Sequence, residues 1–132
     1  MSIMTFLYRG GKKTTYQKLR ENGFDLDKIN SNYGDTLGPG IYLTKIPEEA
    51  LGYAEDRKTI IKVPVLGLNS YKLDRAFSVT SKKHKRKMRE LKQYVIEQGY
   101  NSIESVCGFE TVIFTEFYDI INWNESEILE YI

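Results

Sequence analysis

The chain has 132 residues, the length of a single domain with one hydrophobic core. Its composition is 41% hydrophobic, 13% aromatic and 28% charged, which excludes a largely disordered chain because enough apolar surface is present to offset the entropy lost on ordering. No apolar run approaches the roughly 20 residues that span a bilayer, and the first ten residues lack a secretory signal pattern, so we expect a cytoplasmic protein without a membrane anchor. A single cysteine excludes an intrachain disulfide, and with a single histidine it predicts no metal site.

The charge is unevenly distributed along the chain. All 19 Lys and Arg residues and ten of the 18 acidic residues lie within residues 1–92, which gives +9, whereas residues 93–132 hold the other eight acidic residues, which gives −8. Such asymmetry is typical of a polyanion-binding face, but it also arises when oppositely charged strands from the two parts pair in the fold. Both interpretations stay open at this point.

The first part of the chain predicts two strands and a helix around glycine-rich turns. Residues 5–9 predict a short strand that runs into the glycine pair 10–11, and residues 14–22 predict a helix. Residues 25–40 predict a loop, and a loop of that length in a small domain is usually functional. A second strand is predicted at 41–44.

The rest of the chain alternates helical and strand patterns without a regular repeat. Pro47 suits the first turn of a helix that extends to about residue 56. Residues 59–66 and 70–74 predict a hairpin, in which Pro64 favours an edge position for the first strand. The remaining predicted elements are a long helix at 78–98 and strands at 101–106, 110–115 and 119–123, while the last seven residues suit either a strand or a helix. This order predicts an α+β fold.

Four segments carry motifs that occur in the same order in one enzyme family. They are Phe-Leu-Tyr-Arg-Gly-Gly at 6–11, Gly-Phe-Asp at 23–25, Leu-Gly-Pro-Gly-Ile-Tyr-Leu-Thr at 37–44 followed by Ala50 and Tyr53, and Glu-Thr-Val-Ile-Phe at 110–114. Tyr53 follows Tyr42 by eleven residues, which is the family spacing. Over about residues 7–114 the chain resembles the ADP-ribosyltransferases, especially the branch of the poly-ADP-ribose polymerases and tankyrases.

The resemblance implies an ADP-ribosyltransferase-like split antiparallel β-sandwich with about three helices, and NAD as the substrate. Two tyrosines would enclose the nicotinamide ring, a glycine backbone would bond its carboxamide, an arginine would contact phosphate, and a glutamate would stabilise positive charge developing on the ribose. The candidate catalytic residues are therefore Glu110, Tyr42 and Arg9, and the candidate NAD-binding residues are Tyr8, Arg9, Gly10, Gly40, Tyr42, Thr44 and Tyr53.

The chain departs from its nearest relatives at three positions. Arg9 stands where the polymerase branch has a histidine, and Ala50 stands where it has a serine that bonds the nicotinamide amide, so Thr44 is a candidate to supply that bond. Gly108 stands where arginine-modifying relatives have a second Glu or Gln, which disfavours arginine as the acceptor. Glu104 and Glu116 are candidates to reach the site instead.

A basic run at residues 82–89 lies early in the predicted long helix. Such a run is usually a solvated helix face, and it carries no interleaved aromatic residue for stacking on bases. Its functional interpretation is a weak docking surface for an acidic acceptor, with Lys83, Arg86 and Lys87 as the candidate residues.

These features together favour a small NAD-dependent mono-ADP-ribosyltransferase that acts as a monomer. Its acceptor would be macromolecular, and a host or rival protein is favoured over nucleic acid, as for compact transferases of phages and bacteria. The alternative is a non-catalytic module of the same fold that recognises nucleic acid or an acidic protein through the basic 82–89 helix. An RNA 2′-phosphotransferase relative is disfavoured, because its paired basic motifs are not seen. Transfer and plain NAD hydrolysis stay open, and chain extension is disfavoured.

Overall fold

The computed structural model describes residues 3–11, 13–23, 40–54, 56–74, 82–106 and 108–131. Most of the predicted 25–40 loop, the start of the predicted 78–98 helix and Cys107 lie outside the described residues, as do the side chains of Thr15 and of residues 82–85. None of the described helices is both long and apolar enough to cross a membrane.

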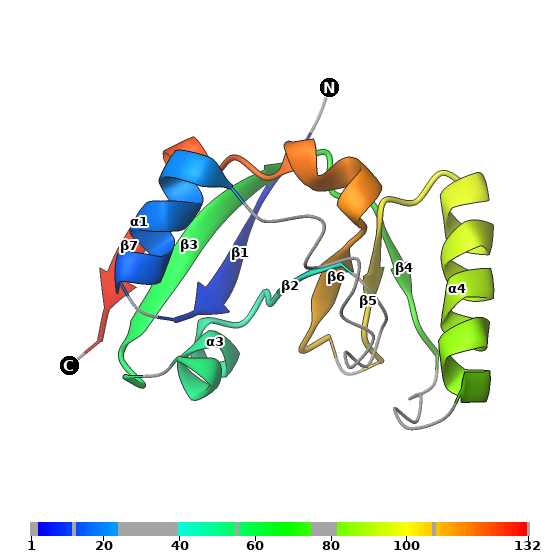
Figure 1. The fold of residues 1–132 in the computed structure, drawn as a ribbon, viewed down its shortest axis with the longest axis horizontal. Coiled ribbons are helices and arrows are strands. Elements are labelled where there is room, and N and C mark those ends of the chain that lie inside the picture. The colour runs from blue at the N-terminus through cyan, green and yellow to red at the C-terminus, as the bar shows by residue number, and fades with distance from the viewer. Residues whose placement is uncertain are drawn as a thin grey trace.

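Seven described strands form two sheets, so the predicted α+β class is confirmed. The first sheet has the order β1-β3-β7 and is antiparallel, with β1 at Met4–Gly10, β3 at Thr59–Leu66 and β7 at Glu127–Glu130. The second has the order β2-β6-β5-β4, with β2 at Ile41–Leu43, β6 at Thr111–Ile113, β5 at Ser102–Glu104 and β4 at Ser70–Lys72. Figure 1 shows the two sheets side by side.

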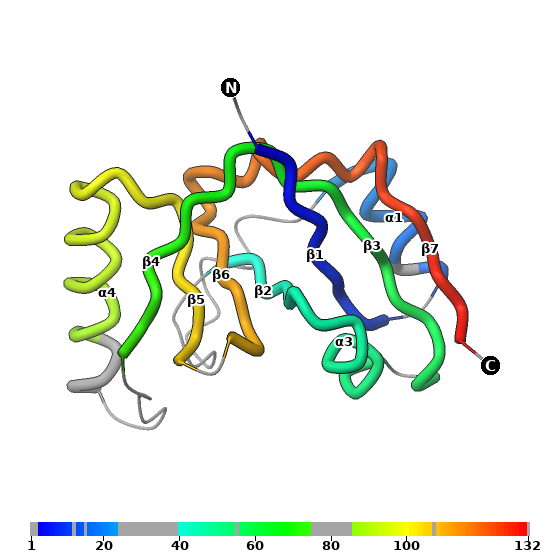
Figure 2. The backbone as a smooth tube through the Cα atoms, turned by 180° about the vertical axis from the view of Figure 1, so that it is seen from behind, coloured from blue at the N-terminus to red at the C-terminus, as the bar shows by residue number. Residues whose placement is uncertain are grey.

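Helices cover the sheets on different sides. The described helices are α1 at Lys13–Asn22, α3 at Pro47–Tyr53 and α4 at Lys82–Glu97, with short 3-10 helices η1 at Thr115–Ile120 and η2 at Trp123–Glu125. Helix α1 lies in front of the first sheet in Figure 1 and behind it in Figure 2, so it covers one face of that sheet. Helix α4 lies at the opposite end of the molecule, beside β4.

The apolar residues gather into two clusters, one on each side of the second sheet. Ile41 and Ile113, which are paired in register, belong to the cluster shared with the first sheet and α1. Ile103 and Val112, also paired, point the other way and pack with Met88 and Val95 of α4. Alternate residues of a strand point to opposite faces, so three-residue strands serve both clusters.

Pro64 does not mark an edge strand, because β3 is the central strand of the first sheet. The pairing of β3 with β7 ends at Lys62 and Glu127, so Pro64 lies beyond the partner on that side. The carbonyl of Pro64 accepts the N–H of Asn122 there, at 3.0 Å. The missing proline N–H therefore removes no bond from the β3–β7 ladder, and a central strand tolerates this proline.

Three other predictions of local structure were wrong. Strands β3 and β4 do not form a hairpin, because β4 joins the other sheet and pairs in parallel with β5. The predicted helix from Pro47 to about residue 56 ends at Tyr53. The predicted strand 119–123 is divided between η1 and η2, and Ile121 makes only an isolated bridge to Val65. By contrast, β3 has the predicted bounds, and the undecided C-terminal residues form β7.

Candidate functional site

The two sheets meet where the end of β1 approaches the end of β2. The N–H of Tyr8 donates to the carbonyl of Thr44 at 2.7 Å, and the N–H of Thr44 donates to the carbonyl of Tyr8 at 2.9 Å. This bridge places the first and third of the four sequence segments, 6–11 and 37–44, side by side. The fourth segment joins them because β2 pairs with β6, which directly follows Glu110.

A cavity of about 310 Å³ lies at this junction, and we call it the inter-sheet pocket. It is at the small end of the range for ligand sites, large enough for a heterocyclic ring with part of a sugar. It is lined by Tyr8, Arg9, Gly10, Tyr42, Leu43, Thr44, Ala50, Tyr53, Phe109 and Glu110. Seven of the eight predicted catalytic and NAD-binding residues therefore line one cavity, and Gly40 is the exception.

Gly10 is required by the close approach of α3 to the end of β1. A Cβ atom on Gly10 would lie 2.1 Å from the carbonyl oxygen of Ala50 and 2.6 Å from the backbone nitrogen of Ala54. Only glycine permits this approach, which brings Ala50 and Tyr53 of α3 to the pocket. The backbone groups of Tyr8 face Thr44, so by alternation those of Gly10 face the same edge of β1.

Arg9 is held from both its backbone and its side chain. Its Nη1 donates to the carbonyl of Tyr42 at 3.2 Å, and its own carbonyl accepts the hydroxyl of Tyr16 at 2.7 Å. Tyr16 is fully buried, and burial raises the pKa of its phenol, so it remains a protonated donor. These bonds fix a permanent positive charge in the wall of the pocket.

The aromatic residues of the pocket differ in exposure. Tyr42 is partly buried and packs against the apolar cluster beneath α4. Tyr53 and Phe109 both line the pocket, yet they are 70% and 47% exposed, respectively. Exposed aromatic rings at the rim of a cavity offer apolar area to a flat ligand.

Thr44 and Ala50 both line the pocket. Thr44 is buried, and its Oγ1 accepts a hydrogen bond from the N–H of Ile46 at 3.1 Å. Ile46 is the residue that directly precedes α3. The hydroxyl hydrogen of Thr44 remains available as a donor, because a hydroxyl can accept and donate at once. This geometry is compatible with the predicted role of Thr44 as a hydrogen-bond donor to a ligand, which the side chain of Ala50 cannot be.

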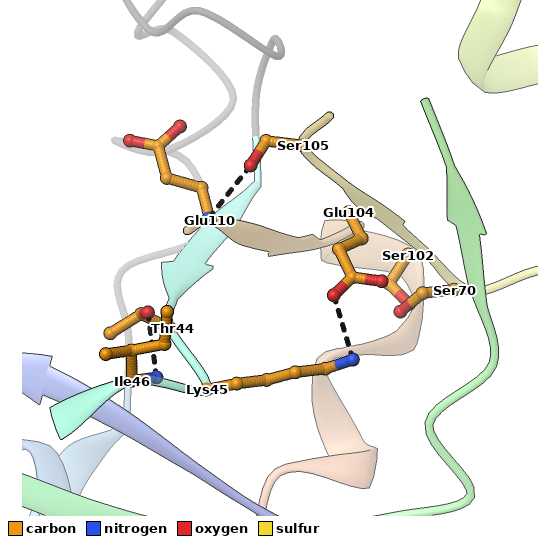
Figure 3. A network of polar contacts seen from close by, with 8 residues as sticks. All are labelled: Thr44, Lys45, Ile46, Ser70, Ser102, Glu104, Ser105 and Glu110. Atoms are coloured by element: carbon orange, nitrogen blue, oxygen red, sulfur yellow. Dashed lines mark hydrogen bonds and ion pairs between the residues drawn. The ribbon is translucent and has the colours of Figure 1, made fainter. Parts of the chain in front are cut away.

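Glu110 lies at the end of a tight turn between β5 and β6. Its N–H donates to Ser105 Oγ at 3.1 Å, and its carbonyl accepts the N–H of Ser105 at 2.9 Å. Gly108, with a φ of 74°, allows the turn and donates its N–H to the carbonyl of Ser105 at 2.9 Å. Figure 3 shows the carboxylate of Glu110 pointing away from the neighbouring Lys45 and Glu104.

Several predicted residues lie elsewhere. Gly40 is buried against β6, where a Cβ would lie 2.4 Å from Val112 Cγ1, so it serves strand packing. Glu104 and Glu116, the candidates to reach the site, are not among the described residues that line the pocket. Their carboxylates pair with lysines, Glu104 with Lys45 and Glu116 with Lys92, each at 2.9 Å. Burial raises the pKa of Glu116, but hydrogen bonds from Lys92 and Thr115 outweigh it and lower the pKa overall.

The basic run forms part of α4, and none of its described side chains lines the pocket. Arg86 and Lys87 are exposed, and the side chain of Lys83 lies outside the described residues.

Two pocket residues, Leu43 and Phe109, were missed by the sequence analysis. Phe109 directly precedes Glu110, and an aromatic residue next to a candidate catalytic carboxylate is a signal that could have found it.

No protein-family model matches the chain, and no curated protein matches it significantly. Within the described ranges, no group of three or more His, Cys, Asp and Glu side chains is arranged to hold a metal ion. The interpretation of the site therefore rests on its sequence motifs, its geometry and its chemistry.

Proposed function

We propose that the chain is a mono-ADP-ribosyltransferase, which cleaves NAD, releases nicotinamide and transfers ADP-ribose to a macromolecular acceptor. One observation carries this proposal: a single cavity gathers Arg9, Gly10, Tyr42, Tyr53 and Glu110, which come from separate parts of the sequence. These five residues are half of the ten that line the cavity, and chance alone is a poor explanation for so many motif residues in one small cavity.

The pocket residues suit the requirements of this reaction. Cleavage of the nicotinamide–ribose bond leaves positive charge on the ribose, and a fixed carboxylate such as Glu110 stabilises that charge in the transition state. The rings of Tyr42 and Tyr53 supply the flat apolar walls that nicotinamide needs. Gly10 offers backbone groups without a side chain in the way, and Arg9 offers a planar cation for phosphate or a ribose edge.

The arrangement of the strands is compatible with the split β-sandwich of this family. Two sheets lie side by side, and the pocket lies where they meet. Helix α4 lies beyond β4, and none of its described side chains lines the pocket. An acceptor that docked on Arg86 and Lys87 would therefore do so away from the candidate NAD-binding residues. The same exposed cations are the observation that favours the alternative function, a binding module for an acidic partner.

The function is tested by incubating the protein with NAD labelled in its adenosine part and measuring both labelled macromolecules and released nicotinamide. Glu110→Gln should lower the rate by about 10²–10³-fold and leave folding intact, because the amide keeps its size but loses the charge that stabilises the transition state. Glu116→Gln is the matched control, since this carboxylate lies outside the pocket and should leave the rate unchanged. Full activity of Glu110→Gln would contradict the assignment.

A further inference from the structure

An ion pair with a buried carboxylate joins the segment after β2 to the end of β5. Lys45 Nζ lies 2.9 Å from Glu104 Oε1, and the side chain of Glu104 is only 8% exposed whereas that of Lys45 is 41% exposed. The other carboxylate oxygen, Oε2, is buried and has no hydrogen-bond partner among the described residues. Removing a carboxylate from water costs more free energy than a single pairing usually returns, and apolar replacements often fold as stably. Stability alone therefore does not account for this pair.

Each partner adjoins a different segment that lines the pocket. Lys45 follows Thr44, which lines the pocket, and precedes Ile46, whose N–H bonds Thr44 Oγ1 at the start of α3. Glu104 precedes Ser105, whose hydroxyl and N–H both bond the backbone of Glu110. One partner is thus continuous with the wall that leads into α3, and the other with the turn that carries Glu110.

The strand register explains why a lysine makes this connection. Leu43 is paired with Thr111, and Thr111 is paired with Glu104, so these three residues lie in a row on one face of the second sheet. Lys45, two residues after Leu43, continues on the same face and reaches across β6 to Glu104, as Figure 3 shows. Beyond Leu43 the β2–β6 pairing has ended, so the ion pair extends the connection between the two walls past the last strand pair.

We propose that Lys45 and Glu104 are positioning residues, which hold Glu110 at a fixed distance from the Thr44 and α3 wall. This inference rests on the proposed function, because it assigns Glu110 a reaction to perform. The β2–β6 pairing ends at Leu43 and Thr111, so without the ion pair the β5–β6 turn that carries Glu110 would be less restrained relative to α3. Loss of such positioning lowers the rate of the chemical step more than it lowers substrate affinity, because the transition state tolerates misplacement least.

The test compares two lysine–glutamate pairs of equal length. Glu104→Gln removes the charge from the positioning pair, and Lys92→Met removes the pair between α4 and Glu116, which has the same 2.9 Å separation and lies outside the pocket. We expect kcat for NAD cleavage to fall about tenfold in Glu104→Gln with KM changed less than about threefold, and kcat to be unchanged in Lys92→Met. Lys45→Arg should keep most of the activity, since it keeps the charge and the bond.

A second variant separates positioning from folding. Lys45→Met combined with Glu104→Leu removes both charges, so it should unfold at a temperature near that of the wild type and still have a reduced kcat. A double variant with both wild-type stability and kcat within about twofold of the wild type would overturn the proposal.

A further measurement does not depend on catalysis. The backbone amide resonances of Glu110 and Thr44 should shift or broaden in Glu104→Gln and keep their positions in Lys92→Met. If the wild type cleaves no NAD while these amides respond, the proposed function fails and the positioning role stands. If the amides are unchanged in Glu104→Gln, the positioning role fails whatever the activity.

Discussion

The contact between Gly10 and α3 allows a sharp test of how the pocket is built. In Gly10→Ala the new methyl carbon would lie 2.1 Å from the carbonyl oxygen of Ala50, 2.6 Å from the nitrogen of Ala54 and 2.9 Å from the carbonyl carbon of Tyr53. Ordinary contacts begin at 3.4 Å, so α3 must retreat by about 1 Å. All three atoms belong to the backbone, and no side-chain rotation can relieve the overlap.

The expected cost follows from what α3 buries. Inserting a methylene into a well-packed interior costs about 1–3 kcal/mol, and here we expect the upper end because the obstacle is rigid backbone. Ala50 and Ala54 are almost fully buried, so a retreat of α3 also opens their packing. Because α3 carries Ala50 and Tyr53 to the pocket, nicotinamide binding should weaken on the order of tenfold, which corresponds to about 1.4 kcal/mol.

The free energy of unfolding is measured by urea denaturation, and nicotinamide affinity by titration. Gly52→Ala is the matched control in the same helix, where a Cβ would meet nothing within 4 Å. It should stabilise the protein by about 0.5 kcal/mol, since alanine favours a helix over glycine. Equal stability of the two variants would refute the reasoning, because it would mean that α3 does not pack on Gly10 as described.

Three further predictions concern cationic residues. Arg9→Ala should raise KM for NAD about tenfold, and Arg9→Lys should raise it less because lysine keeps the charge. Both variants should have unfolding free energies within about 1 kcal/mol of the wild type. A globally unfolded Arg9→Ala would show that the residue is structural. Replacing Lys83, Arg86 and Lys87 with Glu should lower the rate of transfer to an acidic acceptor and leave NAD hydrolysis without acceptor unchanged. The wild-type transfer rate should also fall with added salt. If the wild-type rate does not depend on salt and the variant is fully active, the basic run is only a solvated helix face. Arg57 has a φ of 56°, so Arg57→Gly should raise the unfolding free energy by about 0.5–1 kcal/mol, and a lower urea midpoint would contradict this.

The composition of the pocket could be predicted from the sequence because it depends on residue type. A glycine pair after a strand, two tyrosines at a fixed separation and a glutamate before a strand are local patterns that mean little alone. They indicated one site because, in this order, they resemble one enzyme family. Their meeting in one cavity requires the Tyr8–Thr44 bridge and the β2–β6 pairing, which are contacts between distant residues. The resemblance supplied that arrangement where local patterns could not.

The errors have the same physical origin. Strand β4 reads locally as the second arm of a hairpin, yet its hydrogen bonds go to β5, about 30 residues later in the chain. Pro64 reads as an edge residue, yet its position beyond the end of β7 makes a central strand acceptable. In both cases the outcome depends on where another strand begins or ends, and no window around the residue contains that information.

The pairing of distant strands also decides between the two interpretations of the uneven charge along the sequence. Both sheets combine strands from the basic first part of the chain with strands from the acidic last part. In the first sheet, β1 and β3 join β7. In the second sheet, β2 and β4 join β5 and β6. The pairs Lys45–Glu104 and Lys92–Glu116 each cross the boundary between the two parts. Of the two interpretations of the charge pattern, the structure therefore favours mutual neutralisation over one large basic face. An acidic acceptor would then have to bind a local group of cations such as those of α4, which is why reversal of three charges there is a sufficient test.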